Sequence, residues 1–153
     1  MSLQEFVDLT GYSDQRRKIL SGFLDLRREL KRRGLHGAQW IDGSFLEHEY
    51  RRGRAPADLD VVTWVTAPDL TSMGWLEEAL KDLPVGNDAK KTYLCDVYFD
   101  IANADGFVEP SGAAYWIGLF GHTRSKEWKG FIQISLEEDE DAILIGGSDE
   151  DQE

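Results

Sequence analysis

Residues 40–62, WIDGSFLEHEYRRGRAPADLDVV, contain the pattern that decides the fold we expect for this chain. One apolar run ends at Gly43 and Ser44, and the next apolar run begins just after Asp58 and includes Asp60. A basic loop that contains a proline separates the two runs. Runs rich in β-branched and aromatic residues, bounded by glycine or proline, are typical of β-strands. We therefore expect a strand on each side of the loop, with polar residues at the strand ends.

Asp58 and Asp60 form a pair of carboxylates at the start of the second run. In an extended strand, residues i and i+2 share a face, so both side chains point one way while Leu59 and Val61 point to the core. Two anions this close repel each other unless a cation binds between them. Hard divalent ions with oxygen ligands are the natural partners, so this pair predicts a site for Mg²⁺ or Mn²⁺.

A third carboxylate is expected from the run at residues 92–101, TYLCDVYFDI. Apolar residues alternate clearly in this run, so Asp96 faces away from its more apolar side. On an adjacent strand, Asp96 would complete a three-carboxylate site able to hold two ions about 3.5–4 Å apart, as used for in-line nucleotidyl transfer. Asp100 lies on the same face and is the alternative third carboxylate.

Gly43 and Ser44 predict a phosphate-binding element. A glycine at a strand end lets the backbone approach a ligand closely, and the serine hydroxyl and nearby N–H groups can donate hydrogen bonds to phosphate. A cation that clamps the phosphates is also expected, but no spacing singles one out. The candidates are Lys90, Lys91, Arg124, Lys126 and Lys129, and the loop residues Arg51, Arg52 and Arg54.

Taken together, these motifs resemble the nucleotidyltransferases of the DNA polymerase beta-like superfamily. The resemblance is carried by Gly43-Ser44, thirteen intervening residues, Asp58-Leu59-Asp60-Val61, and Asp96, and it covers residues 40–101. Ala57 departs from the pattern, because the family commonly has serine or another small polar residue there.

The resemblance implies that Asp58, Asp60 and Asp96 bind Mg²⁺ or Mn²⁺ and that Gly43 and Ser44 hold a nucleoside triphosphate, with ATP as the first choice. By length, the chain is similar to the minimal bacterial members of the superfamily. Those members often belong to toxin–antitoxin or phage-defence modules, and some attach AMP to a partner protein.

The 153 residues are 41% hydrophobic and include five tryptophans, which is enough to form one domain with its own core. We expect an α/β (α+β) fold, in which a mixed nucleotidyltransferase-like sheet is flanked by helices. Expected strands cover residues 37–42, 58–65, 92–101 and 130–136, and expected helices cover residues 14–34, 69–83 and 111–121. The many arginines and lysines of the first helix are expected to face solvent.

The end of the chain is strongly acidic. Residues 137–153 contain nine acidic residues and no basic one, and removing these from the formal charge of −12 leaves −3 for the remainder. We expect a domain at residues 1–136 and a flexible acidic tail at 137–153 that disfavours binding to duplex DNA. With one cysteine, Cys95, and neither a signal peptide nor an apolar span expected, the prediction is a cytoplasmic protein that does not enter membranes.

The function that these features predict is a metal-dependent nucleotidyltransferase that moves a nucleoside monophosphate from a nucleoside triphosphate onto a protein or RNA acceptor. The alternative is a binding module that keeps this fold without catalysis, such as an antitoxin or immunity subunit. A serine hydrolase built on Ser44 is disfavoured, because the second flanking glycine of a nucleophile elbow is missing.

Overall fold

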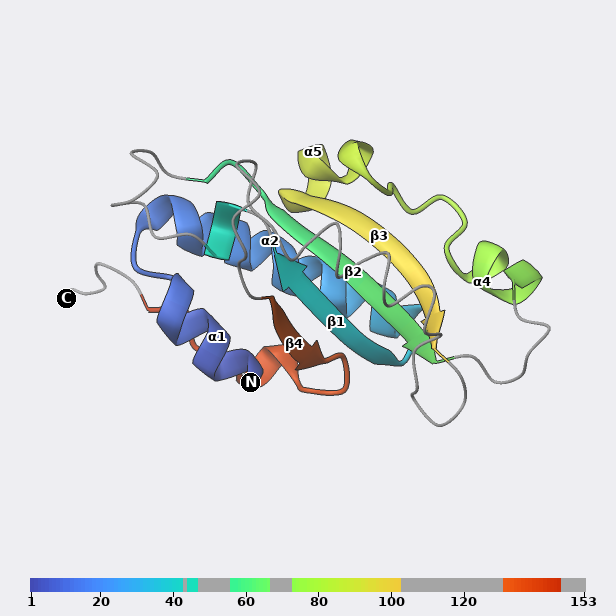
Figure 1. Cartoon of the computed structure of the whole chain (residues 1–153), viewed down its shortest axis with the longest axis horizontal. Helices are drawn as coiled ribbons and strands as arrows, with labels where there is room; N and C mark the ends of the chain where they lie inside the picture. Colours follow the sequence, from blue (N-terminus) through green and yellow to red (C-terminus); the bar gives the residue numbers. More distant parts are fainter. Residues whose placement is uncertain (43, 47–55, 67–72, 103–130, 147–153) are drawn as a thin grey trace.

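A computed structural model describes residues 1–42, 44–46, 56–66, 73–102 and 131–146 of the chain (Figure 1). These residues form helices packed on a four-stranded mixed sheet, in the strand order β3-β2-β1-β4. The predicted α+β class with a single domain is therefore confirmed. Within the described ranges, no helix is both long and apolar enough to cross a bilayer.

Two helices begin the chain and pack against the sheet. The first, α1 (Leu3–Thr10), was not expected from the sequence; Ser2 caps it, because its side chain accepts from the backbone N–H of Glu5 while the Glu5 carboxylate accepts from the Ser2 N–H. The second, α2 (Asp14–Arg32), is capped by Ser13, whose side chain accepts from the backbone N–H of Arg16. In Figure 1, α2 runs behind the sheet.

The sheet consists of β1 (Gly37–Asp42), β2 (Leu59–Thr66), β3 (Cys95–Ala102) and β4 (Ile132–Ser135). Strand β1 pairs antiparallel with both β2 and β4, whereas β2 pairs parallel with β3. The predicted strands at 37–42 and 58–65 are observed to within one residue. The third strand begins at Cys95 rather than at residue 92, because a helical turn precedes it.

Short helical segments connect these strands. They are η1 (Ser44–Leu46), α4 (Met73–Ala79), η2 (Asn87–Ala89), α5 (Lys90–Tyr93) and η3 (Glu140–Ala142). The described part of the helix predicted at 69–83 is helical only from 73 to 79. The helix predicted at 111–121 lies outside the described residues.

The two faces of the sheet contribute to different hydrophobic clusters. Leu59, Val61 and Val65 of β2 join the main core, which also contains the apolar sides of α1 and α2. The next residues in the strand, Val62 and Trp64, point the other way and form a smaller cluster with side chains of neighbouring strands. Asp60 therefore belongs to the face opposite α2, as the alternation predicted.

Two arginines of α2 contradict the expectation of a solvated basic face. Arg16 is 1% exposed and Arg27 is 0% exposed. Arg16 donates from its guanidinium to the backbone oxygen of Phe45 at 2.7 Å. Arg27 pairs with Glu140, from Nε to Oε2 at 2.5 Å. Both cations are therefore structural parts of the interior.

The expectation of little order beyond Leu136 is wrong for residues 137–146. Glu140 is 4% exposed, and Ile143 and Ile145 pack against the main core. The carboxylate of Glu138 accepts from the backbone N–H of Leu3 at 3.0 Å. This part of the acidic region belongs to the folded body, whereas residues 147–153 lie outside the described residues.

Candidate active site

Three aspartates form one row across β1, β2 and β3, near one end of the strands. The register places Asp60 of β2 directly beside Asp42 of β1 and directly beside Asp96 of β3. Residues paired across neighbouring strands point to the same face, and such strands lie about 4.8 Å apart. The sequence predicted Asp60 and Asp96, but it did not predict Asp42, the most buried of the three at 3% exposed.

The register also separates the two candidates for the third carboxylate. Asp96 pairs with Asp60, whereas Asp100 pairs with Trp64. Asp60 and Trp64 are four positions apart, which corresponds to about 13 Å along the strand. Asp96 is thus the carboxylate that lies beside Asp60, and Asp100 stands at the far end of the same face.

Asp58 lies just before β2 and forms an ion pair with Lys90, the first residue of α5. The distance from Nζ of Lys90 to Oδ2 of Asp58 is 2.9 Å. This hydrogen bond raises the pKa of Lys90, so that the amine stays charged. Of the lysines and arginines named as phosphate-clamp candidates, Lys90 therefore lies at the carboxylates, while the loop arginines, Arg124, Lys126 and Lys129 lie outside the described residues.

Electrostatic repulsion in this group of carboxylates is concentrated on Asp60. Burial, and then the negative charges of Asp58, Asp96 and Asp42, raise the pKa of Asp60 to about 7, although Lys90 opposes the shift. Oδ1 of Asp96 is buried and receives no hydrogen bond from any described residue, while Oδ2 accepts from the Tyr98 hydroxyl at 3.1 Å. The row thus has unused acceptor capacity together with excess negative charge.

The carboxylates of this row match part of the ligand set of a divalent cation. Among the described residues, no three acidic, histidine or cysteine side chains converge as a complete ligand set. Mg²⁺, however, usually binds only one or two protein carboxylates and completes its shell with waters and substrate phosphates. Asp60 and Asp96, with oxygen ligands and an unpartnered carboxylate atom, fit that partial role.

Of the predicted phosphate-binding pair, Gly43 and Ser44, the structure describes only Ser44. Gly43 lies outside the described residues, while Ser44 begins η1, two positions beyond Asp42 at the end of β1. The turn η1 contacts both β1 and β2. The backbone of Ser44 is therefore held at the same end of the sheet as the aspartate row.

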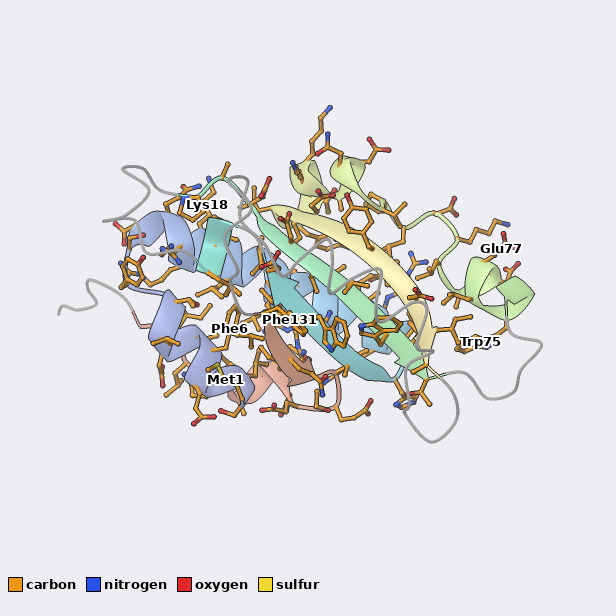
Figure 2. The ribbon with its side chains drawn as sticks, in the orientation of Figure 1. Met1, Phe6, Lys18, Trp75, Glu77 and Phe131 are labelled. Carbon is orange, nitrogen blue, oxygen red and sulfur yellow. The ribbon has the colours of Figure 1, made fainter. Side chains whose placement is uncertain are left out.

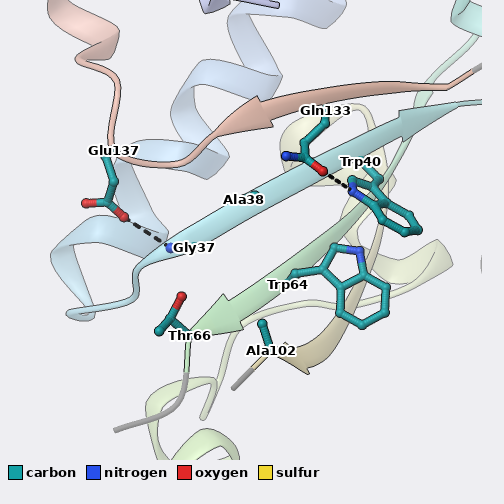
Figure 3. Close-up of a pocket in the computed structure, with 8 residues that line it drawn as sticks. All are labelled: Gly37, Ala38, Trp40, Trp64, Thr66, Ala102, Gln133 and Glu137. Atoms are coloured by element: carbon teal, nitrogen blue, oxygen red, sulfur yellow. Dashed lines mark hydrogen bonds between the residues drawn. The ribbon is translucent and has the colours of Figure 1, made fainter. Parts of the chain in front are cut away.

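An aromatic pocket occupies the same face farther along the strands (Figure 3). Trp40 and Trp64 meet edge to face, with ring centroids 5.0 Å apart, and Phe131 stacks on Trp40 at 4.7 Å. Figure 2 shows Phe131 in front of the sheet, on the side turned away from α2. No pattern in the sequence predicts this pocket, because Trp40 and Trp64 are also ordinary residues for a buried strand.

Comparison with known proteins adds a family but no activity. Residues 1–135 match DUF6932, a family of unknown function, and the chain belongs to this family. The match includes all of the aspartates described above. No curated protein and no solved structure matches the chain.

Proposed function

We propose that this member of the DUF6932 family is a metal-dependent nucleotidyltransferase that transfers the nucleoside monophosphate of a triphosphate, in the first place ATP, to a hydroxyl of a protein or RNA acceptor. The observation that supports this proposal most directly is the row of Asp42, Asp60 and Asp96 in register on three neighbouring strands. A row of carboxylates with an unpartnered buried oxygen is costly for folding alone, and a bound cation removes that cost.

In this proposal Asp60 and Asp96, together with Asp58, hold Mg²⁺ or Mn²⁺ and the triphosphate. The metal supplies positive charge that stabilises the negative charge developing on the phosphate oxygens. The acceptor oxygen attacks the α-phosphorus, the bond to the β-phosphate oxygen breaks, and pyrophosphate leaves. Asp96 accepts the proton of the acceptor hydroxyl, and the backbone at Gly43 and Ser44 binds phosphate oxygens.

Lys90 has a defined place in this scheme. It neutralises Asp58 at 2.9 Å when no other cation is bound there. With a divalent cation on the carboxylates, Asp58 would no longer depend on Lys90 for its counter-charge. The Lys90 amine would then be available to the phosphates of the nucleotide and would stabilise the departing pyrophosphate.

The context proposed with this activity is a cytoplasmic toxin–antitoxin or phage-defence module in which a partner presents the acceptor. Two observations favour the second candidate function, a non-catalytic binding module. Asp58 is already paired with Lys90, and the described residues offer no complete ligand set. A protein of that kind would act by contact and would not respond to metal and nucleotide.

The test is a thermal-shift titration with Mg²⁺ and ATP, separately and together, on the wild-type chain and on Asp60→Asn and Asp96→Asn. Ligand at about 100 times its Kd stabilises the folded state by about 2.7 kcal/mol, so we expect a clear rise in Tm with both ligands present. Asp100→Asn is the matched control, because this carboxylate lies on the same strand and face but beside Trp64.

We expect the shift to be lost in Asp60→Asn and Asp96→Asn and kept in Asp100→Asn. Labelled ATP added to the protein with its co-purified partner then tests transfer directly. If no nucleoside triphosphate changes the Tm at any Mg²⁺ or Mn²⁺ concentration, the enzymatic proposal is wrong and the contact-only module is favoured.

A further inference from the structure

The aromatic pocket on the aspartate face is a formed cavity of about 270 Å³. Its walls include the indoles of Trp40 and Trp64, and its floor is built from the short side chains of Ala38 and Ala102 (Figure 3). Large flat walls over a floor of small residues leave room for a planar group. Cavities of this kind, with a few polar groups at the edge, are the usual form of small-molecule sites.

Two polar groups at the pocket define what it can bind. Trp64 is 2% exposed, and its indole N–H has no hydrogen-bond partner among the described residues, whereas the indole N–H of Trp40 donates to Gln133 at 2.7 Å. On another side, the Glu137 carboxylate accepts from the backbone N–H of Gly37 at 3.1 Å and contacts the His36 ring at 3.0 Å. A carboxylate retains acceptor capacity beyond these contacts.

The pocket and the aspartate row are aligned along the same strands. Trp40 is two residues from Asp42 on β1, and Trp64 is four residues from Asp60 on β2, which corresponds to about 7 Å and about 13 Å. The sugar and phosphates of one nucleotide span this range. Glu137 repels phosphate from the pocket, so an anionic ligand is oriented with its phosphates toward the other end.

We propose that this pocket is a nucleobase site, which binds a base carrying an exocyclic amino group, such as adenine or cytosine. The base lies against the tryptophans, a ring acceptor atom receives the Trp64 N–H, and the amino group donates to Glu137. An aliphatic occupant would leave the Trp64 N–H without a partner and the remaining acceptor capacity of Glu137 unused. The inference rests on the proposed function for the identity of its ligand as a nucleotide, and it adds where the base binds and which bases are accepted.

The experiment is calorimetric titration of the full chain with adenosine, cytidine and uridine in EDTA, so that neither metal nor phosphate contributes. We expect adenosine and cytidine to bind and uridine, which lacks the amino group, to bind more weakly. Trp64→Phe keeps an aromatic ring but removes the donor, and is expected to weaken adenosine binding about fivefold to tenfold. Ala102→Leu fills the floor and is expected to abolish it.

Trp75→Phe is the control, because Trp75 lies on α4 and is 38% exposed. Its affinity for adenosine should equal that of the wild type, and circular dichroism verifies that each variant is folded. The inference is overturned if no nucleoside binds, or if adenosine binds equally to the wild type, Trp64→Phe and Ala102→Leu.

A second titration separates this inference from the proposed function. If magnesium tripolyphosphate binds as tightly as magnesium ATP, the base contributes nothing and the pocket assignment fails, although the metal site stands. If adenosine binds but Mg²⁺ does not tighten ATP, the pocket assignment is supported and the proposed transferase fails.

Discussion

At the scale of single residues, Asp60 carries the strongest electrostatic conflict of the candidate site. Burial and three neighbouring aspartates raise its pKa to about 7. Between its ordinary pKa of 3.8 and 7, the folded chain therefore holds a proton that the unfolded chain has released. The stability associated with this group is present at low pH and is lost as the pH rises through 7.

We expect Asp60→Asn to stabilise the metal-free protein above pH 7 and to have little effect near pH 4, because it removes a charge that the fold accommodates poorly. The shift in the pKa of Asp60, reduced for the partial exposure of its side chain, corresponds to a gain of about 1–2 kcal/mol in the free energy of unfolding. Urea denaturation in EDTA at pH 4 and pH 8.5 measures the difference. An equal effect at the two pH values would show that the stabilisation is not electrostatic.

Individual site residues were predictable to different extents. Asp58, Asp60 and Asp96 follow from spacing and from the alternation of apolar residues within one strand. Asp42 was missed because a single acid before a glycine also suits a turn. The pairing of Lys90 with Asp58 joins residues 32 positions apart in the sequence, and no local pattern reports such a contact.

At the scale of elements, a close helix contact supports the site. Gly22 of α2 lies against the backbone of α5, and a Cβ atom there would come within 2.1 Å of the Tyr93 carbonyl oxygen. Segment α5 contains Lys90 and leads directly into β3, which carries Asp96. The glycine thus lets α2 hold the turn that positions two residues of the candidate site.

Gly22→Ala is therefore expected to destabilise the protein by about 1–3 kcal/mol, because the added methyl group forces α2 and α5 apart. Alanine has the higher helix propensity, so propensity alone would give the opposite sign. Ser21→Ala, at an exposed neighbouring position of the same helix, is the control and should be neutral or slightly stabilising. Chemical denaturation of both variants gives the comparison, and a stable Gly22→Ala would disprove the close contact.

Helices and strands with a clear periodicity of apolar residues were predicted well. Elements whose position depends on tertiary contacts were not. The long helix α2 and strand β1 show clear patterns, and both were found at the expected positions. Residues 92–94 were assigned to a strand because they continue the alternating pattern of residues 92–101. In the fold they belong to or follow α5, and Leu94 adopts a left-handed backbone with φ of 57° before β3 begins.

At the scale of the whole molecule, the acidic C-terminal segment connects the two ends of the chain. Gln4 of α1 donates to the Leu144 carbonyl and accepts from the Leu144 N–H, both at 2.9 Å. Glu140 reaches α2, where it pairs with Arg27 and with Lys31 at 3.0 Å. Composition suggested a solvated tail, because a run of acids gives no sign of a distant basic partner.

Two ion pairs between α2 and the acidic C-terminal segment allow a test of how much this connection contributes to stability. Arg27 and Glu140 are 0% and 4% exposed, whereas Arg28 and Asp141 are 45% and 82% exposed. Removing one partner of a buried pair leaves the other charge buried, which costs about 3–5 kcal/mol. An exposed pair contributes only about 0–1 kcal/mol. The location of the pair, and not its presence, should therefore decide the effect.

We accordingly expect Glu140→Leu to lower the free energy of unfolding by about 3–5 kcal/mol. The double variant Arg27→Leu/Glu140→Leu should recover part of that loss, because no unpaired charge then remains in the interior. Asp141→Leu, which breaks only the exposed pair, should change stability by less than about 1 kcal/mol. Urea denaturation of the three variants and the wild type measures these values. Similar small losses in all of them would mean that residues 137–146 are not anchored through Arg27, and that the acidic segment contributes little to the fold.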